Sequence, residues 1–215
     1  MDNSEYGGAI ASLIDELNQL NEKAIEIGRA IIGSTVLFVD LGFVSLLNRS
    51  VQLTDGFSCM IKERNLTCAG TLLRLQLDNC MRTYALYIAA DRKEFIEALI
   101  SNKKIDGLKD KHGKLMKDWY LKSELNKIDP QFSVVYGNAS GYTHFSGKAF
   151  YQAVSAKENN VIEFQVSHEI PEKLNTILLE CLRAYIHFLK LFYSLIEGAA
   201  DAKAEFESNQ SEKLL

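Results

Sequence analysis

Residues 67–90 read TCAGTLLRLQLDNCMRTYALYIAA, a long run of mainly apolar residues without a proline. Its length and pattern predict one long helix in the interior of a helical fold. Three of the exceptions, Arg74, Asp78 and Arg82, are spaced four residues apart. Because residues four apart share a helix face, these three side chains should form one charged line on an otherwise apolar helix.

This charged line has two interpretations. Burying charges is unfavourable unless they are paired and hydrogen-bonded, so the line needs partners in the folded protein. In the first interpretation, Arg74, Asp78 and Arg82 form a site that binds an anion or a substrate. In the second, they form a structural ion-pair network that fixes the register of the helix. The sequence leaves both open.

Helical patterns continue on both sides of this stretch. From Ile10 to Ile31, apolar residues recur at alternating steps of three and four, which predicts a helix packed along another long helix of the same chain or of a second subunit. Further helices are expected at residues 35–63, 92–100 and 117–128, at residues 129–139 with Asp129 as N-cap and Pro130 in the first position, and from about Pro171 onwards. Residues 140–150 should form a loop, because they are rich in serine and glycine.

Two short runs interrupt the helical pattern. Residues 150–155 and 161–166 contain β-branched and aromatic residues, and the polar stretch AKENN separates them, which predicts a β-hairpin. We therefore expect a mainly α fold: a single domain in which a helical bundle of long amphipathic helices carries a small β-hairpin near residues 150–166. Its expected parts are residues 1–66 with the N-terminal long helices, residues 67–145 with the motifs, residues 146–170 with the hairpin, and residues 171–207 with the C-terminal long helix.

The 215 residues include 24 Lys or Arg and 28 Asp or Glu, which gives a formal net charge of −4. This balance argues against a strongly basic nucleic-acid-binding protein but leaves room for a local basic patch. Residues 101–127 contain eight lysines and four acidic residues, a local balance of +4. That segment either attracts a phosphate backbone or forms a solvated loop of mixed charge.

Residues 30–47, AIIGSTVLFVDLGFVSLL, are about long enough to cross a bilayer. Asp40 lies near their middle, where a carboxylate costs about 2.5–3.5 kcal/mol on insertion, so we expect a buried helix and no membrane partner. The acidic, polar N-terminus MDNSEYGG does not resemble a signal peptide. The four cysteines show no metal-ligand spacing, and we expect reduced thiols in a cytoplasmic protein.

A second polar motif, SGYTHFS at residues 140–146, lies in the expected loop. An imidazole beside hydroxyl groups can act as general acid or base near neutral pH, so His144 is a candidate catalytic residue. A lone loop histidine can equally be a hydrogen-bonded structural residue. The sequence has no Walker loop, no dinucleotide glycine motif and no convincing set of metal ligands, so we expect neither a metal nor a cofactor.

The motifs LLRLQLDN, residues 72–79, and SGYTHFS resemble those of a group of uncharacterised all-helical bacterial proteins of about this length. Those proteins carry an Arg/acid pair on a central helix and a later Tyr-x-His-x-Ser loop, and the likeness covers roughly residues 48–150. Their architecture is similar to that of the HEPN superfamily, small helical domains that often dimerise and often act as metal-independent ribonucleases in toxin–antitoxin and phage-defence systems. The resemblance implies a homodimer that acts on RNA or binds a cognate protein partner.

The resemblance also implies roles for particular residues. In the HEPN motif, four to six residues separate an Arg from a following His, but residues 137–139, the positions for this Arg before His144, contain no arginine, so Arg74 or Arg82 would have to act with His144. The leading hypothesis is a HEPN-like helical bundle with a polar site at these residues. If the protein is an enzyme, the favoured reaction is cleavage of RNA with His144 as general base and Arg74 or Arg82 at the phosphate. The residues expected to bind the substrate are Asp78, Tyr142 and Ser140.

Two other functions are compatible with the same residues. The chain is a non-enzymatic interaction or regulatory module if its Arg/Asp cluster is structural and its amphipathic helices provide a partner surface. It is a small-molecule-binding protein if a pocket forms between the helices, as bundles commonly allow.

Overall fold

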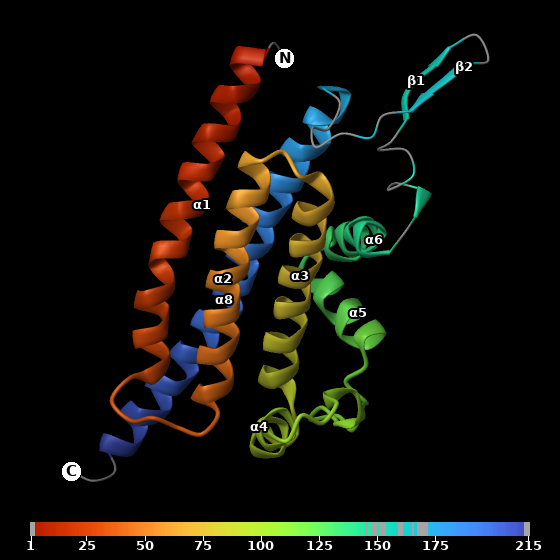
Figure 1. Cartoon of the computed structure of the whole chain (residues 1–215). Helices are drawn as coiled ribbons and strands as arrows, with labels where there is room; N and C mark the ends of the chain where they lie inside the picture. Colours follow the sequence, from red (N-terminus) through yellow and green to blue (C-terminus); the bar gives the residue numbers. More distant parts are fainter. Residues whose placement is uncertain are drawn as a thin grey trace.

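Long helices build most of the fold, which confirms the prediction of a mainly helical protein (Figure 1). The computed structural model describes residues 3–144, 146–147, 150, 154–158, 161–164, 166 and 172–212. The helices are α1 (Asn3–Ile32), α2 (Asp40–Lys62), α3 (Leu66–Ile88), α4 (Arg92–Ile100), α5 (Asp118–Ile128), α6 (Phe132–Thr143) and α8 (Asn175–Glu212), with short 3-10 turns η1 (Ile105–Gly107) and η2 (Glu172–Leu174).

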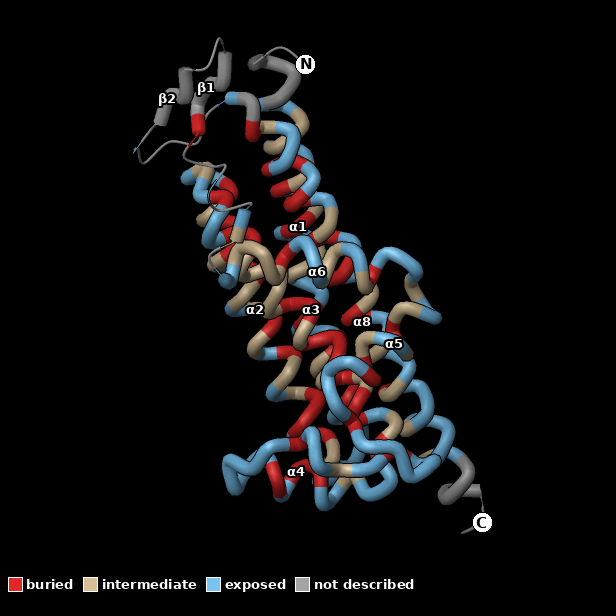
Figure 2. The backbone as a smooth tube through the Cα atoms, turned by 90° about the vertical axis from the view of Figure 1, so that its right-hand side faces the viewer, coloured by how far each residue is buried: buried red, intermediate tan, exposed pale blue. Residues whose placement is uncertain are grey.

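Helix α3 lies at the centre of the packing. It contacts α2 and α8 on one side and α5 and α6 on the other, while α8 runs diagonally behind α1, α2 and α3 (Figure 1). Leu73, Leu77 and Met81 on α3 are buried with Leu182 and Phe188 on α8. These residues belong to one apolar core, and buried residues of both helices are red in Figure 2. The apolar character of residues 67–90 therefore reflects contacts with helices on several sides.

The regular apolar seam of α1 is covered by the chain's own C-terminal helix. Leu17, Ala24, Ile27 and Ile31 are buried, and α1 packs mainly against α8 and α2. The seam therefore pairs with a helix of the same chain, one of the two arrangements that its spacing predicts. A homodimer stays a prediction, and its two copies would have to meet through a surface other than this seam.

The apolar stretch at residues 30–47 is divided between two helices. Helix α1 ends at Ile32, Gly33 adopts a positive φ of 55°, and α2 begins at Asp40 rather than at residue 35. Asp40 determines this boundary, because its carboxylate accepts a hydrogen bond from the backbone N–H of Leu37 at 2.7 Å and so holds the turn before the helix. No helix within the described part of the chain is long and apolar enough to cross a membrane.

Helix α6 differs from the expected helix at both ends. It begins at Phe132, because Asp129 instead ends α5 and its side chain accepts the backbone N–H of Gln131 at 2.9 Å. It continues to Thr143, so the start of the expected loop at residues 140–150 is helical. Packing explains the extension: the Tyr142 ring lies against Gly70 of α3, and the Ser140 hydroxyl donates to a carbonyl one turn earlier.

Two short strands pair within the predicted hairpin region. Strand β1 (Val154–Glu158) lies antiparallel to β2 (Val161–Phe164), with Glu158 opposite Val161. Residues 151–153, 159–160, 165 and 167–171 lie outside the described residues. The predicted hairpin at residues 150–166 therefore falls only partly within the structure, and its turn stays a prediction.

The lysine-rich segment after α4 is held in a defined shape by one buried carboxylate. Asp110 accepts the backbone N–H groups of His112 and Lys114 and the Tyr120 hydroxyl at 2.6 Å. Burial alone would raise the pKa of Asp110, but these hydrogen bonds outweigh it and hold the pKa below its usual value. The exposed lysines around Asp110 are therefore carried on an ordered loop.

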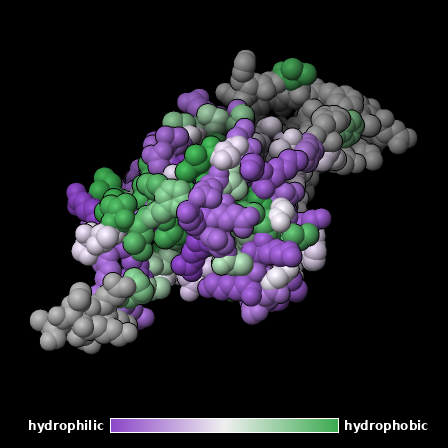
Figure 3. Space-filling model, turned by 90° about the horizontal axis from the view of Figure 1, so that it is seen from below, coloured by the Kyte–Doolittle hydropathy of each residue, from purple (hydrophilic) through white to green (hydrophobic). Residues whose placement is uncertain are grey.

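Exposed apolar side chains gather at the end of the bundle that holds α4 and the connection between α1 and α2. Val36, Phe38, Leu41 and Ile100 are all more than two-fifths exposed. Figure 3, which views this end, shows a hydrophobic area beside hydrophilic surface. Exposed apolar surface of this kind is more often a contact site than polar surface is.

Gly70 allows α3 and α6 to approach closely, and this contact gives a testable prediction. A Cβ at Gly70 would lie 2.4 Å from a ring carbon of Tyr142. Gly to Ala in a helix normally stabilises by about 1 kcal/mol, but overpacking here should reverse the sign. We expect Gly70→Ala to lower the free energy of unfolding by about 1–3 kcal/mol, measured by urea denaturation.

Gly137, in the middle of α6, provides the matched control. A Cβ at Gly137 would meet no atom within 4 Å. Gly137→Ala should therefore raise the free energy of unfolding by about 0.5–1 kcal/mol. If both variants were stabilised equally, α3 and α6 would not be as close as the structure shows.

Candidate functional site

The charged line on α3 forms an ion-pair network with two other helices. Asp78 pairs with Arg82 at 3.0 Å and with Arg49 of α2 at 3.4 Å. Arg82 also pairs with Asp118, the first residue of α5, at 2.7 Å. Arg49 donates a further hydrogen bond to the side-chain oxygen of Asn79. This network, Arg49–Asp78–Arg82–Asp118, connects α2, α3 and α5.

The electrostatics of Arg82 agree with a structural role for this network. Burial works to lower the pKa of Arg82, but the carboxylates of Asp78 and Asp118 outweigh burial and raise the pKa. The guanidinium is thus held in its charged form by two partners. Because both partners are acidic, Arg82 has little electrostatic attraction left for an outside anion.

Arg74 has a different environment, although it lies on the same line. Its guanidinium stacks on the Tyr136 ring of α6, with Cζ 3.8 Å from the ring centroid, and donates to the Tyr136 hydroxyl. The ammonium of Lys122 from α5 lies 5.4 Å from the centroid of the same ring. Among the described residues, no carboxylate lies within ion-pair distance of Arg74 or Lys122, and both are half-buried.

These contacts make the site electropositive. The cations are Arg49, Arg74, Arg82 and Lys122, and the anions are Asp78 and Asp118, so four positive and two negative charges leave a net charge of +2. The cation cluster, as we call these four cations, therefore has two charges that are not neutralised, on Arg74 and Lys122. Partial burial strengthens their field, because water screens it less.

His144 does not join the cation cluster. It follows the last residue of α6 and is exposed, and in the described part of the chain its imidazole has no hydrogen-bond or ion-pair partner. Tyr136 and His144 are eight residues apart, which along a helix corresponds to about 12 Å. Arg74, which stacks on Tyr136, and His144 are therefore about two turns of helix apart along α6.

The predicted site residues thus separate into two groups. Arg74, Asp78 and Arg82 lie together on α3, where Asp78 and Arg82 belong to the ion-pair network and Arg74 stacks on Tyr136. Ser140 and Tyr142 belong to α6, where Ser140 donates to the Tyr136 carbonyl at 2.8 Å and Tyr142 packs on Gly70. Within the described residues, neither side chain forms a hydrogen bond with these arginines, so their role as substrate ligands stays a prediction.

Four site residues were not predicted from the sequence: Arg49, Asp118, Lys122 and Tyr136. Each reaches the charged line from another helix; Arg49, for example, is 29 residues from Asp78 in the sequence. No local spacing indicates such contacts. The composition of residues 101–127 predicted only that this segment carries a net positive charge.

The described residues contain no group of three or more His, Cys, Asp or Glu side chains placed to hold a metal ion. Comparisons with protein families, with curated proteins and with solved structures found no match. The resemblance to HEPN-like proteins is therefore a proposal that depends on the motifs alone.

Proposed function

We propose that this protein binds single-stranded RNA through the cation cluster on α2, α3 and α5, as a HEPN-like protein of a toxin or phage-defence system. The observation that carries the proposal is the pair Arg74 and Lys122, two half-buried cations on one tyrosine ring without an acidic partner among the described residues. Guanidinium and ammonium groups are the usual ligands of phosphate oxygens.

The surface next to Lys122 favours RNA, and not a free phosphate ion, as the ligand of the cation cluster. Trp119, in the first turn of α5, is 67% exposed. An exposed aromatic ring beside cations can stack on an unpaired base, and such stacking contributes about 1–3 kcal/mol per base. The ordered lysine loop at residues 109–117 leads directly into α5 and continues the basic surface.

Fluorescence anisotropy with a labelled single-stranded RNA of 20 nucleotides tests this proposal. Arg74→Gln and Lys122→Gln should each weaken binding about tenfold, because each removes one charged phosphate contact. Lys127→Gln is the matched control on α5, since Lys127 is already paired with Glu124 at 2.7 Å. Unchanged affinity in both test variants, with all three proteins folded, would refute RNA binding at the cation cluster.

Ribonuclease activity is the finer part of the proposal. His144 is exposed at the end of α6, where its imidazole is accessible to a ribose 2′-hydroxyl. We expect the wild-type protein to cleave total RNA in the presence of EDTA and His144→Ala to be inactive. Equal cleavage by the two proteins, or no cleavage by either, would refute catalysis by His144 and leave only RNA binding as the proposed function.

The second candidate function is a non-enzymatic interaction module. The network Arg49–Asp78–Arg82–Asp118 favours it, because two arginines and two aspartates neutralise each other and tie three helices together. If the cluster is purely structural, Arg74→Gln and Lys122→Gln lower the melting temperature and leave RNA affinity unchanged. If the cluster binds RNA, the same two variants should instead lose RNA affinity and keep the melting temperature of the wild type.

A further inference from the structure

A cleft separate from the cation cluster lies between α6 and α8, with α3 as its floor. Its volume is about 850 Å³. Pockets that bind small molecules usually measure about 300–1,000 Å³ and occur between the helices of bundles. Along α6, the cleft is lined from Gln131, the residue before the helix, to Tyr142, which corresponds to about 16 Å. Its size and length suit an elongated small molecule.

The interior of the cleft is apolar. Its buried lining residues are Leu66, Leu73, Ala139, Leu174 and Cys181. Burial raises the pKa of the Cys181 thiol to about 12, so the thiol is neutral at physiological pH and acts as apolar surface instead of as a nucleophile. A ligand that fills this space gains affinity by removing apolar surface from water.

The rim of the cleft is polar and is formed largely by α8. Glu180, Arg183 and His187 all line it. His187 is paired with Asp129 at the end of α5. Arg183 is exposed, and neither it nor Glu180 has an ion-pair partner among the described residues. Arg183 therefore presents an unused guanidinium at the edge of an apolar cavity.

We propose that this cleft binds an elongated amphiphile whose apolar chain lies on the floor and whose carboxylate pairs with Arg183. A medium-chain fatty acid has this chemistry. The guanidinium of Arg183 matches a carboxylate because its planar N–H groups can donate two parallel hydrogen bonds. Glu180 would attract a cationic headgroup instead. The sign of the charge on the ligand that binds most tightly therefore shows whether Arg183 or Glu180 holds its headgroup.

This site is independent of the proposed RNA-binding surface. Tyr136 of α6 contacts Arg74 and Lys122, whereas the neighbouring Val135 and Ala139 line the cleft. No residue of the cation cluster lines the cleft. Variants of the cleft should therefore leave RNA affinity unchanged, and the failure of either proposal would not affect the other.

Isothermal titration with decanoate, decanol and decyltrimethylammonium tests the proposal. We expect decanoate to bind most tightly to the full chain. Arg183→Gln should weaken decanoate about tenfold and leave decanol unchanged, because it removes one charged hydrogen-bonding partner. Glu180→Gln should strengthen decanoate binding by removing a like charge at the rim.

A blocking variant tests the location. Ala184 is half-buried and lines the cleft, so the ring of Ala184→Phe should occupy the middle of the cleft and block binding of all three ligands. Ala204→Phe, at an exposed position further along α8, is the matched control and should bind decanoate as the wild type does. Tighter binding of decyltrimethylammonium than of decanoate, equal binding by Ala184→Phe and Ala204→Phe, or no binding of any ligand would each overturn the proposal.

Discussion

Replacing Lys203 with methionine is expected to lower the free energy of unfolding by about 3–5 kcal/mol. Lys203 of α8 pairs with Asp40 at 2.6 Å, and the two side chains are only 8% and 4% exposed. Its ammonium also donates to the carbonyls of Ile31 and Ile32, the last residues of α1. Lys203→Met removes the counter-charge of a buried carboxylate and the donor to two helix-end carbonyls. Urea denaturation followed by circular dichroism measures the loss.

Two further variants make this test specific. Lys190, also on α8, pairs with Glu16 at 2.7 Å but is more than half exposed, so Lys190→Met should cost about 0–1 kcal/mol. The double variant Asp40→Leu/Lys203→Met should recover most of the stability, because no charge is then left buried alone. A loss below about 1 kcal/mol for Lys203→Met would contradict the burial of this pair.

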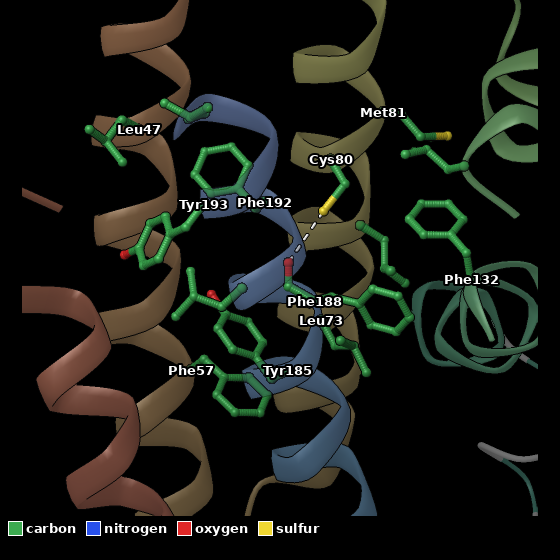
Figure 4. Close-up of a cluster of buried hydrophobic side chains, with 14 of the residues drawn as sticks. Leu47, Phe57, Leu73, Cys80, Met81, Phe132, Tyr185, Phe188, Phe192 and Tyr193 are labelled. Atoms are coloured by element: carbon green, nitrogen blue, oxygen red, sulfur yellow. Dashed lines mark hydrogen bonds between the residues drawn. The ribbon is translucent and has the colours of Figure 1, made fainter. Parts of the chain in front are cut away.

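Phe188→Ala should destabilise the protein by about 3–5 kcal/mol. The Phe188 side chain is fully buried, and its ring meets that of Phe132 at 5.5 Å with an interplanar angle of 89°. Its carbonyl accepts the Cys80 thiol of α3 (Figure 4). Phe188 thus lies where α3, α6 and α8 meet, and its removal leaves a cavity that none of these helices can close.

Phe206 is the control for Phe188, because it is a phenylalanine of the same helix that is 54% exposed. Phe206→Ala should change the free energy of unfolding by less than about 0.5 kcal/mol. Denaturation midpoints of the two variants give the comparison. Similar midpoints would mean that α8 does not pack against α3 and α6 as described.

Periodicity was sufficient to predict most of the helices. The a/d spacing of residues 10–31 and the apolar run of residues 67–90 correspond to α1 and α3, and α4 begins and ends where expected. These features are predictable because each depends on residues within a few turns. The start of α6 was not, because Asp129 is needed at the end of α5, where its carboxylate meets His187 of α8.

The candidate site was predictable only in part, because most of its contacts join residues that are far apart in the sequence. The line Arg74–Asp78–Arg82 follows from spacing on one helix. Whether each charge is neutralised depends on Asp118, Lys122 and Tyr136, which other helices bring to the line. The sequence therefore indicated where the charges lie and left undecided which of them stays available to a ligand.

The salt dependence of RNA affinity tests the central claim most directly. For single strands, the slope of the logarithm of the association constant against the logarithm of salt concentration changes by about 0.7 for each cation that contacts a phosphate. The double variant Arg74→Gln/Lys122→Gln should therefore have a slope about 1.4 shallower than the wild type. Trp119→Ala should weaken binding without changing the slope, because stacking releases no counterions. Equal slopes for the wild type and the double variant would contradict the claim that Arg74 and Lys122 bind RNA phosphates.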